Sequence, residues 1–255
     1  MLVTVDIGNT NIVLGFMEGG SIAGTYRIAT KAQHTSDEYG ILLTEFMELS
    51  GYGRGDVEGV IICSVVPKVM HSFRASIVKF LGVEPLIVGP GVKTGIAVRI
   101  DDPKSLGADL LAGAAGAMAE YGGPALVADF GTATTYIHLD AGGAIDSGVI
   151  TAGIRTAANA LWGQTAQLPE VEITRPRSIL ATNTIDCMQA GLYYDALGGV
   201  EMIIRRFREA LDEPFRVIVT GGLGRVFEGD SDLIDVYDPD LILKGMAAIW
   251  QRNRR

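Results

Sequence analysis

The chain has 255 residues, of which 48% are apolar and 20% are charged, so it can bury a large core and is not expected to be disordered. Its formal net charge of -9 argues against a nucleic-acid-binding surface, because such a surface needs a basic patch to neutralise phosphates. No apolar run approaches the roughly 18 residues that a membrane span requires.

Cysteine usage and the N-terminus indicate the compartment. The two cysteines, Cys63 and Cys187, have neither the spacing of a zinc site nor that of a disulfide framework. The first apolar run has no basic segment before it and is interrupted by Asp6, so we expect no secretory signal. We therefore expect a soluble protein of the reducing cytoplasm.

The first part of the chain is expected to alternate strands with helices. A capping-box pattern of Thr35 and Glu38 begins the first helix, and Pro67 begins a second that runs to about Leu81. Residues 89–104 lack periodicity and are expected to form a loop. Strands are expected over residues 2–7, 11–17, 21–28, 57–65 and 85–88. This arrangement predicts an α/β fold with a mixed sheet.

The rest of the chain repeats the strand pattern after a helix of small residues that runs from about Leu106 to Ala119. Strands are expected over residues 125–130, 134–139, 144–150 and 215–219. Helices are expected over residues 154–168, from about 184, over 198–211 and over 241–253.

One hairpin pattern occurs twice, at a constant offset of 123 positions (129 minus 6). At that offset Asp6 aligns with Asp129 and Gly8 with Gly131. The glycine pair at 19–20 aligns with the pair at 142–143. Matches at one offset, all at turns or strand ends, favour a duplicated architecture over two unrelated hairpins.

The paired hairpins also predict a nucleotide site. Glycine lets backbone N–H groups approach phosphate oxygens, and the acids Asp6 and Asp129 offer oxygen ligands to a metal–phosphate cluster. A single Asp-x-Gly turn is more often an ordinary hairpin, so it is the second copy that favours a nucleotide site. A third glycine turn, at residues 220–224, follows another β-branched strand and is equally typical of a plain strand-to-helix turn.

Asp109 is the most unusual acid, because it lies among small apolar residues just after the long loop. One interpretation is that it only interacts with the N-terminal dipole of its helix. The other is a general base held in a partly desolvated position next to phosphate.

Taken together, these segments resemble the type III pantothenate kinase family over nearly the whole chain. The matching motifs are Asp6-Ile-Gly-Asn-Thr10, Gly107-Ala-Asp109, Asp129-Phe-Gly-Thr-Ala-Thr-Thr135, Met188-Gln-Ala-Gly191 and Thr220-Gly-Gly222. The resemblance implies the fold of the acetate and sugar kinase, heat-shock-70 and actin superfamily. That fold has two duplicated ribonuclease-H-like halves with mixed sheets, for which we expect residues 1–112 and 113–255.

The resemblance also implies an activity and an assembly. The activity is ATP-dependent phosphorylation of pantothenate to 4'-phosphopantothenate, the first step of coenzyme A biosynthesis. The implied cofactors are magnesium and a monovalent cation, potassium or ammonium. The implied assembly is a homodimer with active sites at the subunit interface, without nucleic-acid or membrane partners.

The site residues follow by analogy with the family. Asp109 is implied as the proton acceptor, Asp129 as a ligand of the monovalent cation, and Asp6 as a ligand of magnesium. The implied ATP contacts are Asp6, Gly8, Asn9, Thr10, Asn11, Thr132, Gly221 and Gly222. The implied substrate contacts are Gly107, Ala108, Asp109, Leu110 and Thr184, the last of them across the dimer.

Two positions depart from the family pattern. Leu110 replaces an arginine that faces the carboxylate of pantothenate, and Ile100 replaces a tyrosine. Losing a charge-assisted donor costs about 1.5–3 kcal/mol of binding free energy unless another group substitutes, and Arg99 and Arg155 are candidates. Two alternatives therefore stay open. One is a nucleotide-binding paralogue with a regulatory or accessory role and no kinase activity, and the other is a kinase for a different small hydroxylated acceptor.

Overall fold

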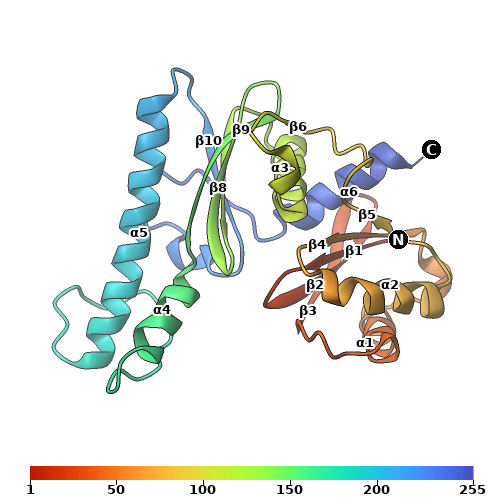
Figure 1. Cartoon of the computed structure of the whole chain (residues 1–255), viewed down its shortest axis with the longest axis horizontal. Helices are drawn as coiled ribbons and strands as arrows, with labels where there is room; N and C mark the ends of the chain where they lie inside the picture. Colours follow the sequence, from red (N-terminus) through yellow and green to blue (C-terminus); the bar gives the residue numbers. More distant parts are fainter. Residues whose placement is uncertain (255) are drawn as a thin grey trace. The chain divides into compact units, whose positions relative to one another are not determined.

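The computed structural model describes residues 1–254, which divide into two compact units (Figure 1). The first unit contains residues 1–96 and 101–120, together with the chain from Leu241 onward. The second contains residues 97–100 and 121–240. This division follows packing rather than sequence order, since the last helix returns to the first unit. The boundary after residue 112, which concerns the duplicated halves of the sequence, stays a prediction.

The first unit is a five-stranded mixed sheet with helices on both faces, in the strand order β3-β2-β1-β4-β5. The strands are β1 (Leu2–Ile7), β2 (Asn11–Glu18), β3 (Ser21–Ala29), β4 (Gly59–Ser64) and β5 (Leu86–Ile87). The helices are α1 (Ser36–Leu49), α2 (Pro67–Leu81), α3 (Ala108–Glu120) and α6 (Leu241–Asn253), with short 3-10 helices η1 (Arg54–Asp56) and η2 (Pro103–Ser105). β1 pairs antiparallel with β2 and parallel with β4, which confirms the predicted mixed sheet.

The second unit is a six-stranded mixed sheet in the order β11-β10-β7-β8-β9-β6. The strands are β6 (Ala97–Val98), β7 (Ala125–Phe130), β8 (Ala133–Leu139), β9 (Ala144–Ala152), β10 (Arg216–Thr220) and β11 (Val236–Tyr237). The helices are α4 (Ile154–Gly163), α5 (Thr184–Ala210) and the 3-10 helix η3 (Gly224–Phe227). Within residues 1–254, no helix combines the length and the apolar character needed to cross a membrane.

The two sheets repeat one topology, which confirms the duplication. The order β3-β2-β1-β4-β5 corresponds strand for strand to β9-β8-β7-β10-β11. β1 and β7 begin 123 residues apart (125 minus 2), and so do β3 and β9 (144 minus 21). Both middle strands also carry a register shift, between Phe16 and Met17 in β2 and between His138 and Leu139 in β8. The copies therefore share even an irregularity of the hairpin.

Three local expectations were wrong. A single helix, α5, replaces the two expected from about residue 184 and over 198–211. Gly198 and Gly199 lie inside this helix. They do not end it, because a glycine in a helix interior lowers helix stability by only about 1 kcal/mol relative to alanine. α4 ends at Gly163 rather than near residue 168. The expected loop at 89–104 contains β6, which pairs with β9.

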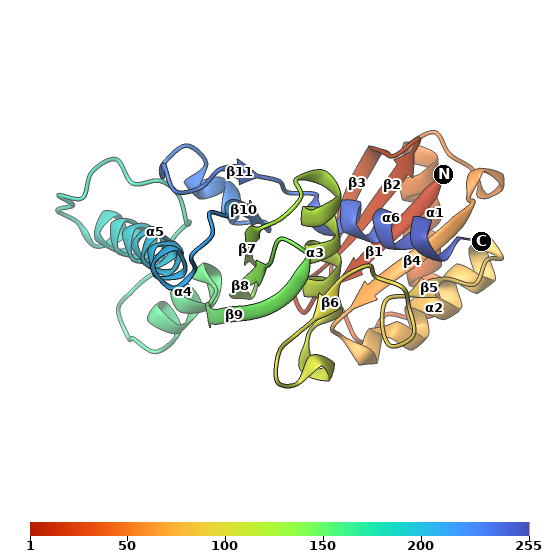
Figure 2. The ribbon, with the colours of Figure 1, turned by 90° about the horizontal axis from the view of Figure 1, so that it is seen from above.

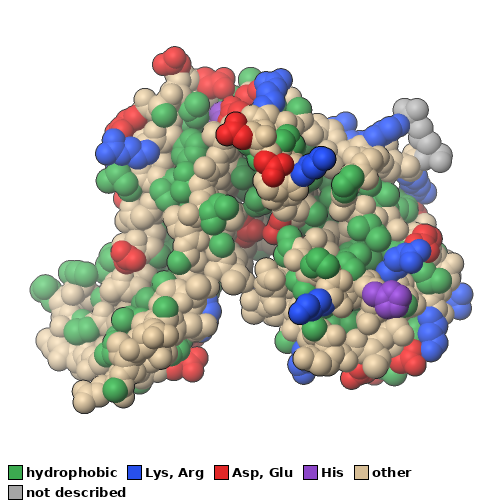
Figure 3. Space-filling view, viewed as in Figure 1, with side chains coloured by type: hydrophobic (Ala, Val, Ile, Leu, Met, Phe, Trp, Pro, Cys, Tyr) green, Lys and Arg blue, Asp and Glu red, His purple; other side chains and the backbone are tan. Residues whose placement is uncertain are grey.

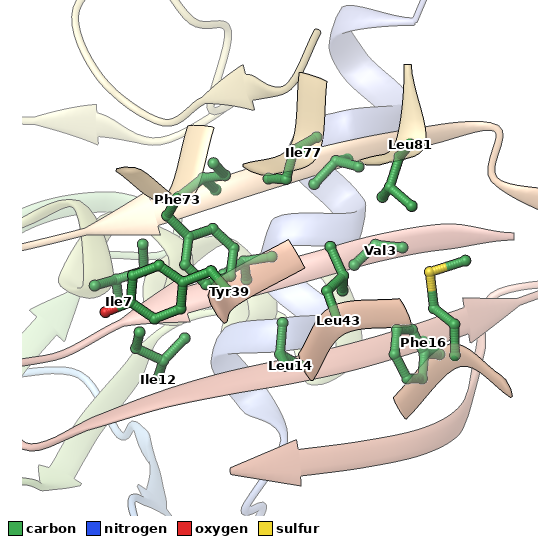
Figure 4. Packing of buried hydrophobic residues seen from close by; sticks show 14 of the residues in the cluster. Val3, Ile7, Ile12, Leu14, Phe16, Tyr39, Leu43, Phe73, Ile77 and Leu81 are labelled. Atoms are coloured by element: carbon green, nitrogen blue, oxygen red, sulfur yellow. The ribbon is translucent and has the colours of Figure 1, made fainter. Parts of the chain in front are cut away.

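One face of the first sheet is covered by α1 and α2. Alternate β1 residues, Val3, Val5 and Ile7, point into this layer and are fully buried. They pack against apolar side chains of the two helices, among them Tyr39 and Phe73, as Figure 4 shows. The predicted capping box of Thr35 and Glu38 begins α1, so the helix starts where its sequence specifies.

The other face of the first sheet is covered by α3 and α6, which cross at very short range (Figure 2). A Cβ at Gly245 would overlap the carbonyl oxygen of Ala112, and one at Gly116 would overlap that of Leu241. The two backbones can approach only because neither position has a side chain. This contact fixes where α3 begins relative to β1 and β4.

We therefore expect Gly245→Ala to lower the free energy of unfolding by about 1–3 kcal/mol, because the helices must separate to admit the methyl group. Gly113→Ala in α3 is the matched control. A Cβ there would meet Ile242 at 3.9 Å, an ordinary contact, so the substitution should be neutral or stabilise by up to about 1 kcal/mol. Urea unfolding curves of both variants measure the difference. Equal stability of the two would contradict the proposed role of the crossing.

Candidate active site

In the first unit, the turn after β1 presents the first group of predicted residues. The Gly8 N–H donates to the Asn11 carbonyl at 3.0 Å, which closes the turn. Thr30, the residue after β3, then holds this turn: its hydroxyl donates to the Gly8 carbonyl at 2.7 Å and its N–H to the Thr10 carbonyl at 2.9 Å. Asn9 and Thr10 are left exposed at the tip. A turn fixed in this way can offer donors to phosphate oxygens without first becoming ordered.

Asp6 lies at the end of β1, directly opposite Cys63 in β4. It alternates with Val5 and Ile7, so its side chain points to the sheet face that carries α3 and α6. Asp109 reaches the same face from the first turn of α3. The burial of Cys63 raises the pKa of its thiol well above the ordinary value, and the charges of Asp6 and Asp109 raise it further. The structure therefore brings both carboxylates close to one buried thiol.

The Asp109 carboxylate turns back over the start of its own helix. Its Oδ1 accepts the Leu110 N–H at 2.8 Å, and a Cβ at Gly107 would collide with this oxygen. The missing side chain at Gly107 thus leaves room for the carboxylate. Burial raises the pKa of Asp109 above its ordinary value, and the hydrogen bond from Leu110 offsets only part of that effect. Asp109 is therefore a stronger base than an exposed aspartate.

Leu110 and Ile100, the two departures from the family pattern, are both half-buried. Of the arginines considered as substitutes, Arg99 is paired through Nη1 with Asp140 at 2.6 Å. Arg155 is exposed near the start of α4. Neither residue is identified by these contacts as a replacement for the missing arginine.

In the second unit, Asp129 occupies the position in β7 that Asp6 occupies in β1, and it pairs with Thr220 in β10. The chain then turns at Gly221, which has a φ of +88°. A Cβ at Gly221 would collide with the Asp129 carboxylate and the Phe130 backbone. Position 221 therefore requires glycine for two reasons, its positive φ and its close approach to Asp129 and Phe130. Gly222 follows and is exposed.

The hairpin turn at Thr132 is held by the start of α4. The carbonyl of Thr132 accepts the Thr156 hydroxyl at 2.6 Å and the Gly153 N–H at 3.2 Å. A Cβ at Gly153 would overlap the carbonyl oxygens of Gly131 and Thr132, so this contact also needs a glycine. Thr184, by contrast, is the exposed first residue of α5, after the N-cap Asn183.

Comparison with known proteins identifies the family. The model of the type III pantothenate kinase family matches residues 2–206. The type III pantothenate kinase of Bifidobacterium longum strain DJO10A is 72% identical over 254 residues, which cover 99% of each chain. The chain belongs to the type III pantothenate kinase family. It is therefore a kinase, as the ordered motifs predicted.

Solved structures confirm the fold. Ethanolamine utilization protein EutJ from Carboxydothermus hydrogenoformans is similar with a TM-score of 0.58 and 15% identity, over 97% of this chain and 89% of that one. The activator of 2-hydroxyisocaproyl-CoA dehydratase from Clostridium difficile, solved with bound ADPNP, is similar with a TM-score of 0.55 and 13% identity. That similarity covers 100% of this chain and 98% of the activator chain. The predicted actin-like ATPase and sugar kinase fold is thus correct.

Sequence reasoning missed two features of the site. Cys63 was considered only for zinc and disulfide spacing, whereas it lies near Asp6 and Asp109. No helix or strand was expected between residue 168 and about residue 184, and this segment was given no role, whereas it carries Arg175 and Arg177 and lines a cavity with the start of α5. Two arginines on either side of Pro176 were the available signal.

We expect Asp109→Asn to be more stable than the wild type at pH 7. The raised pKa means that the folded state disfavours the ionised carboxylate, so wild-type stability falls as pH rises from the ordinary aspartate value through the raised one. The variant cannot titrate, and its advantage should shrink as the pH is lowered toward 4. Urea unfolding at both pH values measures this. A variant that is less stable than the wild type at pH 7 would contradict the burial of the charge.

Proposed function

We propose that this protein transfers the γ-phosphoryl group of ATP to pantothenate and so catalyses the first step of coenzyme A biosynthesis. Membership of the type III pantothenate kinase family supports the reaction. The single structural observation that carries the proposal is the half-buried Asp109 carboxylate in the first turn of α3, with its raised pKa. A cytoplasmic location is part of the same proposal.

The proposed reaction is an in-line displacement. Asp109 accepts the proton of the substrate hydroxyl as the hydroxyl oxygen attacks the γ-phosphorus. A new P–O bond forms to the substrate, and the bond between the γ-phosphorus and the β,γ-bridging oxygen breaks, so ADP leaves. No covalent enzyme intermediate is required, and the protein contributes mainly position and charge. The raised pKa brings the base closer to the operating pH, which favours proton transfer.

The ATP contacts are proposed from the glycine turns of each unit. In the first unit they are Asp6, Gly8, Asn9, Thr10 and Asn11. In the second they are Thr132, Gly221 and Gly222. The ordered turns at Gly8 and Thr132 support this assignment, because hydrogen bonds from Thr30 and Thr156 already hold their carbonyls.

Magnesium and a monovalent cation, potassium or ammonium, are proposed cofactors. Within residues 1–254 no cluster of three or more His, Cys, Asp or Glu side chains could hold a metal alone. The Asp6 carboxylate still fits magnesium, which commonly takes one or two carboxylates and completes its shell with phosphates and waters. Asp129, against the backbone of Gly221, is the proposed ligand of the monovalent cation. Bound cations would neutralise phosphate charge.

The acceptor contacts are proposed at Gly107, Ala108, Asp109, Leu110 and Thr184. Leu110 supplies no charge for a carboxylate, and this observation favours one alternative, a kinase whose acceptor lacks that group. Assays with pantothenate and with neutral hydroxylated analogues distinguish the two candidates. Turnover of a neutral analogue alone would favour the alternative.

We also propose a homodimer, supported by exposed apolar side chains before and along α5. Figure 3 shows separate hydrophobic side chains on the surface at the lower left of the view, where this part of the second unit lies. Ile179, Leu180, Ile185 and Met202 are 62%, 83%, 51% and 53% exposed. Ile179 and Leu180 precede α5, and Ile185 and Met202 lie in it; exposed apolar side chains that are close together are typical of an interface.

Ile185→Asp should convert the proposed dimer to a monomer, because a charge at the centre of an apolar interface is desolvated without a partner. Light scattering coupled to size exclusion measures the mass. Ile41→Asp in α1 is the matched control, since Ile41 is 52% exposed and lies in the other unit. A wild-type monomer, or an Ile185→Asp dimer, would contradict the proposal.

Asp109→Asn should lower kcat by about 10²–10⁴-fold, because it removes the general base. A coupled ADP-release assay with pantothenate, ATP, magnesium and potassium measures this. Wild-type activity should also fall on the acidic side at a pH above the ordinary aspartate pKa, since that of Asp109 is raised. Asp101→Asn is the control, because Asp101 is an exposed acid that precedes Asp109 in the same unit, and this variant should keep activity. Equal turnover by Asp109→Asn and the wild type would rule out the assigned base.

A further inference from the structure

A cavity of about 400 Å³ lies in the second unit in front of α5. Its walls are the segment from Thr174 to Thr182 and side chains from the first two turns of the helix, including Asp186 and Gln189. This volume falls within the range of small-molecule sites in proteins. The function proposed above involves no ligand in this cavity.

The segment that forms the cavity wall contacts α5 at one point, and the chain just before the segment contacts it at another. The Gln189 amide donates to the Glu172 carbonyl at 3.1 Å, and the Cys187 thiol lies 3.6 Å from the Ala181 carbonyl. Within the segment, the Leu180 N–H donates to the Ser178 hydroxyl at 3.0 Å. The wall is therefore held in place without a ligand, which lowers the entropic cost of binding one.

The lining of the cavity carries a positive charge in an acidic protein. It contains two arginines, Arg175 and Arg177, and one carboxylate, Asp186. Two of these three charged groups have a partner. Arg175 is paired with Asp230 at 2.7 Å, and the Asp186 carboxylate accepts the Asn183 amide at 2.6 Å. Arg177 forms no ion pair or hydrogen bond within residues 1–254. Its guanidinium is therefore available to a ligand, and it favours an anion with two acceptor oxygens.

The position of the cavity links it to the acceptor substrate. Thr184, a proposed substrate contact, lies between Thr182 and Asp186, both of which line the cavity. At the same time, Leu110 leaves the substrate carboxylate without a charged partner. We propose that this cavity binds the carboxylate of the acceptor substrate, with Arg177 as its cationic contact. The inference rests on the proposed function, since it concerns how pantothenate is recognised.

The test compares pantothenate with its neutral alcohol analogue, in which a hydroxymethyl group replaces the carboxylate. Calorimetric titration of the full-length wild type and Arg177→Gln gives the dissociation constant of each ligand. The substitution should weaken pantothenate binding about 10-fold or more and leave binding of the alcohol unchanged. In the ADP-release assay, KM for pantothenate should rise by a similar factor, while kcat and KM for ATP stay the same.

Arg208→Gln is the matched control, because Arg208 is also exposed but lies near the far end of α5, about 36 Å from Thr184 at 1.5 Å per residue. It should bind both ligands like the wild type. Circular dichroism melting curves establish that each variant is folded.

Three results would overturn the inference. If Arg177→Gln binds pantothenate as tightly as the wild type, the cavity does not bind the substrate carboxylate through Arg177, while the proposed function is unaffected. If binding of both ligands weakens equally, Arg177 only shapes the segment. If the wild type neither binds nor phosphorylates pantothenate, the proposed function itself fails, and the inference fails with it.

Discussion

The contact between α3 and α6 is the constraint on which the first unit depends most. The helix that closes the chain packs its backbone against the helix that carries Asp109, and glycines at 116 and 245 permit this approach. α3 also packs through Ala112 and Ala115 against the sheet residues Ile61 and Cys63. The first turn of α3 is thereby positioned from two sides. The role proposed for Asp109, a general base, needs this kind of rigid support, because a small displacement of the base lowers the rate of proton transfer.

The same packing determines the electrostatics of the site. Bringing α3 onto the sheet removes water from Asp109 and raises its pKa, and it places the Asp109 charge near Cys63 and Asp6. The ionised carboxylate is disfavoured in the fold, so burial lowers the stability of the protein at neutral pH and makes Asp109 a stronger base. Such a compromise between stability and activity is common where charges are buried at active sites. The duplicated fold supplies a second acid, Asp129, in a different setting, next to the positive-φ turn at Gly221.

Duplication gives the two units one topology but different chemistry at their strand ends. After β4 the first unit continues into α2 with a proline at the start of the helix, whereas after β10 the second unit turns at Gly221. The second unit also carries α5, whose first turns border a cavity with an available arginine. Local replacements at equivalent positions thus give the two units different surfaces at their strand ends from one sheet order.

The sequence by itself determined the strands of both hairpins, their repetition, the capping box at Thr35 and the family, because period, turn chemistry and motif order are local. It did not distinguish one long α5 from two helices, since Gly198 and Gly199 break a helix or not according to packing. Only the tertiary structure decided that Asp109 is buried near Asp6 and Cys63, and that Arg177 lines a cavity without an ion-pair partner among the described residues. Burial and charge depend on segments far apart in the chain, and no local pattern records which of them meet.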